Sequence, residues 1–282
     1  MHVLAHGGAG SEPDEPAPRQ AVLEGAVEAG QQASHPLDAV ETALRRLESA
    51  PRFNAGRGSA VQSDGVIRTD AGLMTGDGQI GAAAAMPGVE HAARVARVVL
   101  AETPHVMLAG ERARALAADF GIETEADLWT ERSRERWNEA DPPAGGPRAQ
   151  LGWVRERFGG SDTVGAVATD GDRIAAGTST GGRWFALAGR VGDVPQVGSG
   201  FYAGERAAAS ATGAGEAIAR AGLSRKAVQR VESGADPATA AAEALAEFES
   251  LTGSTAGVIV LDRAGTQGTA FNSAAMQTAG TD

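Results

Sequence analysis

The sequence contains no cysteine and little histidine, and both shortages exclude particular kinds of site. Without cysteine, the 282 residues can form no disulfide framework, cysteine-ligated zinc or iron–sulfur site, or cysteine nucleophile. The histidines form no HExxH motif or similar ligand pair, so a histidine-based metal site is not expected. The histidines are His2, His6, His35, His91 and His105.

Long apolar runs and clusters of basic residues are missing as well. No run approaches the ~20 apolar residues that span a bilayer. The first residues, MHVLAHGGAG, lack the basic start and long apolar stretch of a signal peptide. The 36 acidic residues outnumber the 25 basic ones, and no basic stripe is present. We therefore expect a cytoplasmic protein that binds neither membranes nor nucleic acid.

One glycine-rich segment resembles a dinucleotide-binding fingerprint without matching it. Gly198, Gly200 and Gly204 precede a predicted helix, but the third glycine comes one place late and no acidic residue follows at a strand end. A plain glycine turn before a helix explains the segment better, so no nucleotide cofactor is expected.

The order of the predicted elements favours an α+β layered fold. Helical and strand patterns alternate without the regular strand–helix–strand order of a doubly wound sheet. Residues 130–162 are charged, aperiodic and rich in proline and glycine, which predicts a linker or mobile loop. Helices are predicted at 19–33, 36–49, 89–100, 106–120, 205–221, 224–233 and 237–251, a hairpin at 59–70, and strands at 1–5, 79–86, 163–169, 173–178, 257–262 and 268–271.

Threonine in glycine-rich surroundings is the most specific chemical feature. Thr163 lies where the aperiodic segment meets a strongly apolar strand. One interpretation is structural, because β-branched residues are common at strand starts. The other is that cleavage of the Asp162–Thr163 bond makes Thr163 an N-terminal nucleophile, with its own α-amine as the general base. That chemistry requires no histidine, cysteine or cofactor.

Several short motifs follow one another along the chain. They are HGGAG at 6–10, the segment 47–59 with LE and RFNAGRGS, TPHV at 103–106, DTVGAVA at 162–168, TSTGG at 178–182, GRVGD at 189–193 and TGAGE at 212–216. Each motif alone is weak evidence, but the ordered set resembles the plant-type asparaginase / isoaspartyl peptidase family of N-terminal-nucleophile hydrolases. The resemblance covers nearly the whole chain outside the aperiodic segment.

The resemblance implies a set of catalytic roles. Thr163 is similar to the nucleophile of the family, and Thr180 to the threonine that hydrogen-bonds it. The Thr212 hydroxyl and the Gly213 N–H are similar to the oxyanion hole, whose donors face the charge that develops on the scissile carbonyl. Asn54 is similar to the asparagine near the nucleophile's amine, and a plain turn residue is the alternative.

The resemblance also implies a substrate clamp. Arg190 and Asp193 would hold the α-carboxylate and α-ammonium of the substrate, since a guanidinium binds a carboxylate through two hydrogen bonds. Gly215, together with Thr212 and Gly213, would let the backbone approach the ligand. The alternative is a surface ion pair between Arg190 and Asp193, worth ~0–1 kcal/mol.

A structural sodium ion is a further implication, and no other cofactor is expected. Backbone carbonyls would bind it, and these leave no side-chain signature. The carbonyls would come from Leu47, Glu48, Ala50, Phe53, Ala55 and Arg57.

The family's fold is a four-layer αββα sandwich, so the resemblance implies one domain over 1–282. Autocleavage would divide it into 1–162, with a flexible tail from about residue 130, and 163–282, in a homodimer of αβ units. The implied substrates are small molecules: L-asparagine, cleaved at its β-amide, and β-aspartyl (isoaspartyl) dipeptides. Asp162 stands where glycine is common in the family and is similar to the related glycosylasparaginases. A glycosylasparaginase-like amidase and a non-processed, non-enzymatic relative are the alternatives.

Overall fold

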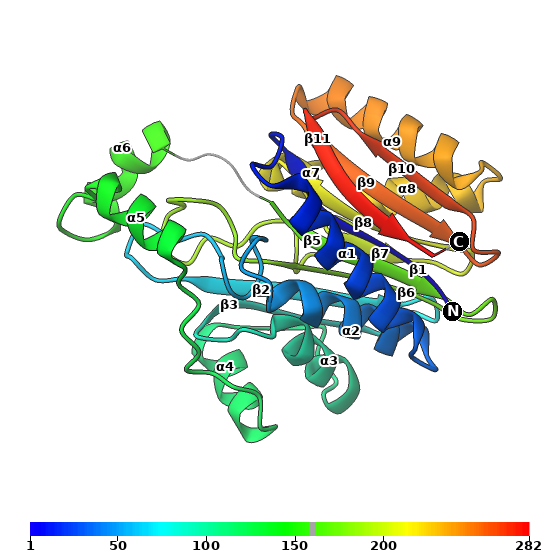
Figure 1. The fold of residues 1–282 in the computed structure, drawn as a ribbon, viewed down its shortest axis with the longest axis horizontal. Helices are drawn as coiled ribbons and strands as arrows, with labels where there is room; N and C mark the ends of the chain where they lie inside the picture. Colours follow the sequence, from blue (N-terminus) through cyan, green and yellow to red (C-terminus); the bar gives the residue numbers. More distant parts are fainter. Residues whose placement is uncertain (158–161, 282) are drawn as a thin grey trace.

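Two β-sheets packed face to face form the centre of the molecule. The computed structural model describes residues 1–157 and 162–281. In these described residues, the larger sheet has the order β11-β1-β5-β6-β2-β3-β4; its β3–β4 pair is parallel and its other strand pairs are antiparallel. The smaller sheet has the antiparallel order β10-β9-β8-β7. Contacts of β1 with β9, and of β5 and β6 with β8, join the two sheets (Figure 1).

The strands take the following bounds. The larger sheet contains β1 (His2–Gly10), β2 (Arg68–Thr75), β3 (Ile80–Pro87), β4 (Met107–Ala109), β5 (Val164–Thr169), β6 (Ile174–Thr180) and β11 (Ala275–Gly280). The smaller sheet contains β7 (Phe201–Ala203), β8 (Ala207–Gly213), β9 (Ala256–Asp262) and β10 (Gln267–Phe271).

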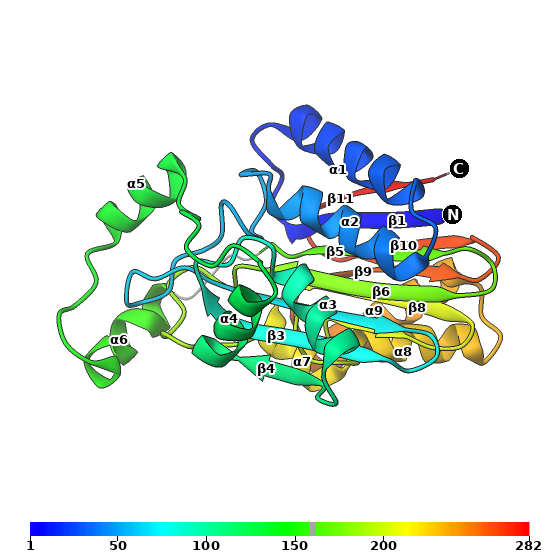
Figure 2. The ribbon, with the colours of Figure 1, turned by 90° about the horizontal axis from the view of Figure 1, so that it is seen from below.

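Helices cover the outer faces of both sheets (Figure 2). On the larger sheet, α1 contacts β1 and β11, α2 contacts β5 and β6, and α3 contacts β2 and β3. On the smaller sheet, α8 and α9 contact β8, β9 and β10. None of the helices within residues 1–157 and 162–281 is long and apolar enough to span a bilayer. The helices are α1 (Pro16–Gln31), α2 (Pro36–Glu48), α3 (Ala92–Glu102), α4 (Gly110–Asp119), α5 (Glu131–Ala140), α6 (Pro147–Arg157), α7 (Gly215–Ala221), α8 (Leu223–Glu232) and α9 (Pro237–Thr252).

Local sequence signals set both ends of α9. At the start of α9, Asp236 Oδ1 accepts hydrogen bonds of 3.0 Å from the backbone N–H of Ala238 and of Thr239, and Pro237 takes the first helical position. The helix ends at Gly253, whose φ of 62° is left-handed. The prediction of a helix at 237–251 is confirmed for this reason.

The central strands consist of small residues because they are covered on both faces. Every residue of β5 (VGAVAT) and of β6 (IAAGTST) is buried. A strand between two packed layers shows a continuous apolar run rather than alternation. Where the sheets meet most closely, glycine is required: a methyl group on Gly72 of β2 would overlap the ring of the fully buried Phe201 on β7.

The structure differs from the sequence-based prediction in several elements. The helix predicted at 205–221 is wrong, because 207–213 form β8 and only 215–221 form a helix. Alanine favours helices, but the AAASATG run of β8 packs between the larger sheet and α8, and burial on both faces decides its conformation. The helix predicted from residue 106 begins at 110, since 107–109 pair with β3. The hairpin predicted at 59–70 is reduced to one bridge between Val61 and Ile67.

The segment predicted to be a loop contains two helices, α5 and α6, which lie apart from the two sheets (Figure 1). A capping box of Thr130 and Ser133 starts α5. Aromatic packing attaches the pair, since the ring of Phe185 lies 5.1 Å from that of Trp153 and 6.4 Å from that of Trp137. Residues 158–161 of the predicted loop are outside the described residues. That this segment becomes a flexible tail after cleavage stays a prediction.

The contact at Gly72 yields a test of how closely the sheets pack. We expect Gly72→Ala to lower the stability by about 1–3 kcal/mol through overpacking, and so to lower the thermal midpoint by several degrees. Gly25→Ala is the control: Gly25 lies inside α1 with open space around it, and alanine there favours the helix by up to about 1 kcal/mol. A wild-type midpoint for Gly72→Ala in calorimetry would contradict the close approach.

Candidate active site

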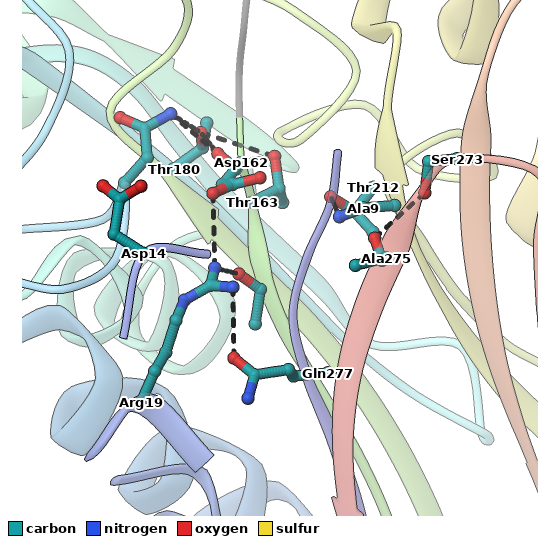
Figure 3. A network of polar contacts seen from close by, with 12 residues as sticks. Ala9, Asp14, Arg19, Asp162, Thr163, Thr180, Thr212, Ser273, Ala275 and Gln277 are labelled. Carbon is teal, nitrogen blue, oxygen red and sulfur yellow. Dashed lines mark hydrogen bonds and ion pairs between the residues drawn. The ribbon is translucent and has the colours of Figure 1, made fainter. Parts of the chain in front are cut away.

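Thr163 lies immediately before β5, with its side chain beside the end of β6. It is 4% exposed. Its hydroxyl donates to Thr180 Oγ1 over 3.5 Å, and Thr180 is the last residue of β6 (Figure 3). Strand pairing places Val164 opposite Ser179 and so brings these two threonines together. The structure therefore juxtaposes two of the predicted catalytic residues.

The carbonyl of the Asp162–Thr163 peptide is held from two sides. Asn54 Nδ2 donates to Asp162 O over 2.7 Å, and Thr180 Oγ1 donates to the same oxygen over 3.3 Å. Asn54 is itself fixed, because its Nδ2 also donates to Gly182 O and its Oδ1 accepts from Ala60 N. Asn54 thus does more than a turn residue requires, and two donors polarise this carbonyl.

Arg19 contacts the side chain of Asp162, and the sequence analysis missed it. Arg19 Nη2 lies 3.2 Å from Asp162 Oδ2 and also donates to Gly7 O (Figure 3). Burial raises the pKa of the Asp162 carboxyl, while the guanidinium of Arg19 and, less strongly, that of Arg132 oppose this. Arg19 lies on the same face of α1 as Leu23 and Val27, so an arginine in line with apolar positions was the signal that the sequence offered.

Thr212 comes from the other sheet, at the end of β8. Its Oγ1 accepts a hydrogen bond of 3.3 Å from Ala9 N on β1, which leaves the hydroxyl proton available to a ligand (Figure 3). Gly213 has a φ of 131°, and a side chain there would meet Thr255 O at 2.6 Å. Thr212 does not cap α7, whose N-cap is Ala214 without a side-chain hydrogen bond. The position of Thr212 is therefore not explained by a capping role at this helix.

A second contact between the sheets lies beside Thr212. His6 Nε2 on β1 is 2.8 Å from Ser210 Oγ on β8, and both residues are fully buried. Burial lowers the pKa of His6 to about 3, although a hydrogen bond with the backbone of Thr163 opposes this shift. The ring is therefore neutral at pH 7. A side chain on Gly165 would overlap both His6 and Ser210, so glycine is required where these two residues meet.

Arg190 and Asp193 meet at the start of α7. A side-chain carbon on Gly215 would lie 2.5 Å from Asp193 Oδ1 and 2.8 Å from Arg190 Nη2, which places both charged groups against this glycine. Arg190 Nε donates to Glu216 Oε1 over 2.7 Å, and Arg183 Nη1 lies 3.1 Å from Glu216 Oε2. Asp193 is buried. The alternative of a plain surface ion pair does not fit this burial.

Two buried carboxyls of this cluster have displaced pKa values. Burial raises the pKa of Asp193 to about 6, against the opposing charge of Arg190. Burial likewise raises the pKa of Asp70 to about 7, opposed by a hydrogen bond from Ala85 N. Asp70 lies opposite Thr180 in the β2–β6 pair, where the β2–β3 register shifts. The sequence analysis missed Asp70, whose signal was a single acid within a strand of small residues.

The segment predicted to bind sodium folds into one tight turn. Arg57 N donates to Glu48 O, Ala50 N to Leu47 O, and Phe53 N to Ala50 O. Gly56, with a φ of 53°, lets the chain pass against the carbonyl of Glu90.

The donors of this turn fit a hard cation. No cluster of three acidic or histidine side chains that could hold a metal occurs in the part of the chain that the structure describes, so backbone oxygens would supply the ligands. Glu48 is fully buried, and its Oε1 accepts from Ser179 Oγ and Ala93 N. Its Oε2 accepts no hydrogen bond from the described residues and has only His91 Nδ1 at 3.5 Å. Because Oε2 of this buried carboxylate has no hydrogen-bond donor among the described residues, a nearby cation would stabilise its charge.

A cavity of about 190 Å³ opens beside the Asp162–Thr163 bond. Asn54, Asp162 and Trp184 line it together with Arg132 and Arg136 of α5. The Arg136 guanidinium stacks 4.3 Å above the ring of Trp184. Helix α5, in the segment predicted to be a loop, therefore forms one wall of the cavity beside the candidate site.

Comparison with known proteins gives concordant results. A family model described as Asparaginase matches residues 1–282. The plant-type L-asparaginase of Pyrococcus abyssi is 40% identical over 291 residues, which cover 96% of this chain and 92% of that protein. The isoaspartyl peptidase/L-asparaginase of Danio rerio is 37% identical, with 97% and 90% covered. That of Rattus norvegicus is also 37% identical, with 97% and 84% covered.

The raised pKa of Asp70 predicts a pH-dependent effect of its removal. Between about pH 4 and pH 7 the folded protein keeps a proton that the unfolded chain releases, so this carboxyl lowers stability as pH rises. We expect Asp70→Asn, which can still accept from Ala85 N, to raise the thermal midpoint relative to wild type by several degrees at pH 8 and little at pH 5. The exposed Asp172→Asn is the control for loss of one carboxylate. An equal effect of Asp70→Asn at both pH values would contradict the assignment.

Proposed function

Because this chain belongs to the asparaginase family, we propose that it hydrolyses the β-amide of L-asparagine and the β-aspartyl bond of isoaspartyl dipeptides, with Thr163 as the nucleophile. The observation that carries this proposal is the position of Thr163. Its hydroxyl lies against Thr180, and the carbonyl that precedes it is held by Asn54 and Thr180. Thr163 at the start of β5 is then explained by its role as a nucleophile as well as by the preference of β-branched residues for strands.

Self-cleavage at Asp162–Thr163 creates the nucleophile. Thr163 Oγ attacks the carbonyl carbon of Asp162, and the negative charge on the oxygen is stabilised by Asn54 Nδ2 and Thr180 Oγ1. The C–N bond breaks, the nitrogen of Thr163 takes up the hydroxyl proton, and Asp162 is left as an ester on Oγ. Water hydrolyses this ester to a C-terminal carboxyl on Asp162 and a free N-terminal Thr163.

Hydrolysis of substrate uses the same hydroxyl. The amine of Thr163 accepts the proton from Oγ as Oγ attacks the side-chain carbonyl of the substrate. Thr212 Oγ1 and Gly213 N–H donate to the oxyanion. The proton passes to the leaving group, which departs as ammonia or as an amino acid. Water, activated by the same amine, then releases aspartate from the β-aspartyl ester.

The charged groups at Gly215 hold the amino-acid end of the substrate. Arg190 binds the α-carboxylate. Glu216 accepts a hydrogen bond from Arg190 Nε and so orients the guanidinium. Asp193 binds the α-ammonium. Its Oδ2 is buried and accepts no hydrogen bond from the described residues, as an ammonium site requires before its ligand arrives. Since burial raises the pKa of Asp193 to about 6, binding should weaken as pH falls through this value.

We further propose the layered architecture, a bound sodium ion, the fate of the tail after cleavage and the assembly. Helices on one sheet, two packed sheets and helices on the second sheet support the four-layer αββα sandwich. A structural sodium ion would be held by the backbone carbonyls of Leu47, Glu48, Ala50, Phe53, Ala55 and Arg57. The segment from about residue 130 would remain as the tail of the first chain, and αβ units would pair as a cytoplasmic homodimer. A glycosylasparaginase-like amidase and a non-processed relative stay as the alternatives.

Replacement of Thr163 tests both reactions. We expect Thr163→Ala to abolish chain cleavage and hydrolysis together, because one hydroxyl serves both, and Thr163→Ser to retain part of each. Intact mass spectrometry follows cleavage, while asparagine, β-aspartyl-leucine and a glycosylated asparagine are assayed side by side. Cleavage of purified Thr163→Ala at Asp162–Thr163 would refute self-processing, and preference for the glycosylated substrate would favour the amidase alternative.

Thr212 is tested through the transition state. Thr212→Val is nearly isosteric and deletes the hydroxyl, so we expect kcat for asparagine to fall ~10²–10³-fold with a smaller change in KM. Thr212→Ser should recover much of the activity. Cleavage and thermal midpoint are checked first, since the variant also loses the acceptor of Ala9 N. A folded, fully cleaved Thr212→Val enzyme with near wild-type kcat would remove Thr212 from the oxyanion hole.

A further inference from the structure

The proposed self-cleavage does not use the ion pair beside the bond to be cut, in which Arg19 is buried and the Asp162 side chain is 38% exposed. Arg19 of α1 is 7% exposed, and its Nη2 lies 3.2 Å from Asp162 Oδ2. The same nitrogen donates to Gly7 O, and Nη1 donates to Gln277 Oε1 on β11 over 3.3 Å (Figure 3). The guanidinium also stacks 4.8 Å from the centre of the Phe53 ring. Arg19 is therefore held rigidly by other groups, with one edge facing Asp162.

The backbone beneath Asp162 is shaped for its carboxylate. A side-chain carbon on Gly8 would lie 2.7 Å from Asp162 Oδ1 and Cβ, so only glycine leaves space for this side chain. Gly8 has a φ of 116°, a conformation that other residues rarely adopt. The side chain of Asp162 is thus confined between Gly8 and Arg19, while its carbonyl is held by Asn54 and Thr180.

We propose that Arg19 is a positioning residue for self-cleavage: by fixing the carboxylate of Asp162 over Gly8, it holds the Asp162–Thr163 peptide where Thr163 Oγ can attack it. This inference rests on the proposed function and adds to it a residue that acts on cleavage through Asp162. Two contacts hold the carbonyl and one ion pair holds the side chain, so the residue before the scissile bond has little freedom left to rotate. Reducing that freedom favours an intramolecular attack.

The charge of Asp162 makes the pair sensitive to pH. Burial raises the pKa of the Asp162 carboxyl, and Arg19 is the strongest opposing charge. Without Arg19 the pKa rises further, so the carboxylate forms only at higher pH. His6 on the adjacent strand stays neutral because burial lowers its pKa to about 3. Among the described residues, the other charged groups around Asp162 are Arg132 and Arg136 of α5 and, along the two cavities that Asp162 lines, Glu12, Asp14, Glu15 and Arg52.

The experiment follows cleavage of the full-length chain with time after cell-free synthesis, by gel and intact mass, at several pH values. We expect Arg19→Gln to slow cleavage by about tenfold, the loss typical of a hydrogen bond to a charged group. The pH dependence of the cleavage rate of Arg19→Gln should shift to higher pH, because its Asp162 carboxyl loses its proton only at higher pH. Arg19→Lys keeps the charge but loses the planar guanidinium that reaches Gly7 and Asp162 together. Its cleavage rate should therefore lie between those of wild type and Arg19→Gln.

A double-mutant cycle separates this role from a structural one. In an Asp162→Asn background, adding Arg19→Gln should change the rate by less than about twofold, because the partner charge is already gone. Arg52→Gln is the matched control. Arg52 lines the same cavity and pairs with Glu15 instead, so its cleavage rate and pH profile should equal those of wild type. Circular dichroism confirms that each variant folds.

The outcomes are distinct. If wild type cleaves and Arg19→Gln cleaves equally fast with the same pH profile, the role of Arg19 is wrong and the proposed function stands. If Arg19→Gln slows cleavage equally in both backgrounds, Arg19 acts through the packing of α1 and not through Asp162, which also overturns the inference. If Arg19→Gln does not fold, Arg19→Lys in the two backgrounds gives the same comparison. A wild-type chain that never cleaves overturns the proposed function and this inference together.

Discussion

The close packing of the two sheets is the constraint on which the candidate site depends. Thr163 belongs to one sheet and Thr212 to the other, so their relative position is set by the contacts between β1, β5 and β8. Gly165 permits these contacts, and Gly72 permits the contact of β2 with β7, because neither residue has a side chain to hold the sheets apart. Two polar contacts then fix the register across the interface: His6 with Ser210, and Ala9 N with Thr212. Because alternate residues of a strand face the same side, both contacts lie on one face of β8.

Charge is distributed around this interface in two separate groups. On one side, Arg19 faces Asp162 beside the bond proposed to be cut. On the other side, Arg183, Arg190, Glu216 and Asp193 gather at the start of α7. Burial raises the pKa of Asp162 and of Asp193 alike, because a carboxylate loses hydration in both places. The same physical effect thus serves two proposed purposes: one carboxylate is compensated before cleavage, and the other awaits a substrate cation.

Much of the fold could be predicted wherever local signals agreed with the tertiary environment. Asp236, Pro237 and Gly253 delimit α9 through their own conformational preferences, and the apolar run after Thr163 is a strand as expected. The prediction failed where burial overrode propensity. The alanine-rich β8 is a strand because layers cover both of its faces, and alanine by itself favours a helix. The segment after Thr130 is helical because the rings of Trp137, Trp153 and Phe185 pack together, which no periodicity revealed.

The sequence by itself determined the chemistry available to this protein. It excludes cysteine chemistry, and its ordered motifs contain Asn54, Thr163, Thr180, Thr212, Arg190 and Asp193, because the motifs record residue type and order. Only the tertiary structure decided what surrounds them. Arg19 and Asp70 come from segments without a motif, and they reach the site through a helix packed on the sheet and through strand pairing. Their pKa shifts and ion pairs depend on burial and distance, and these quantities exist only once residues far apart in the chain are packed together.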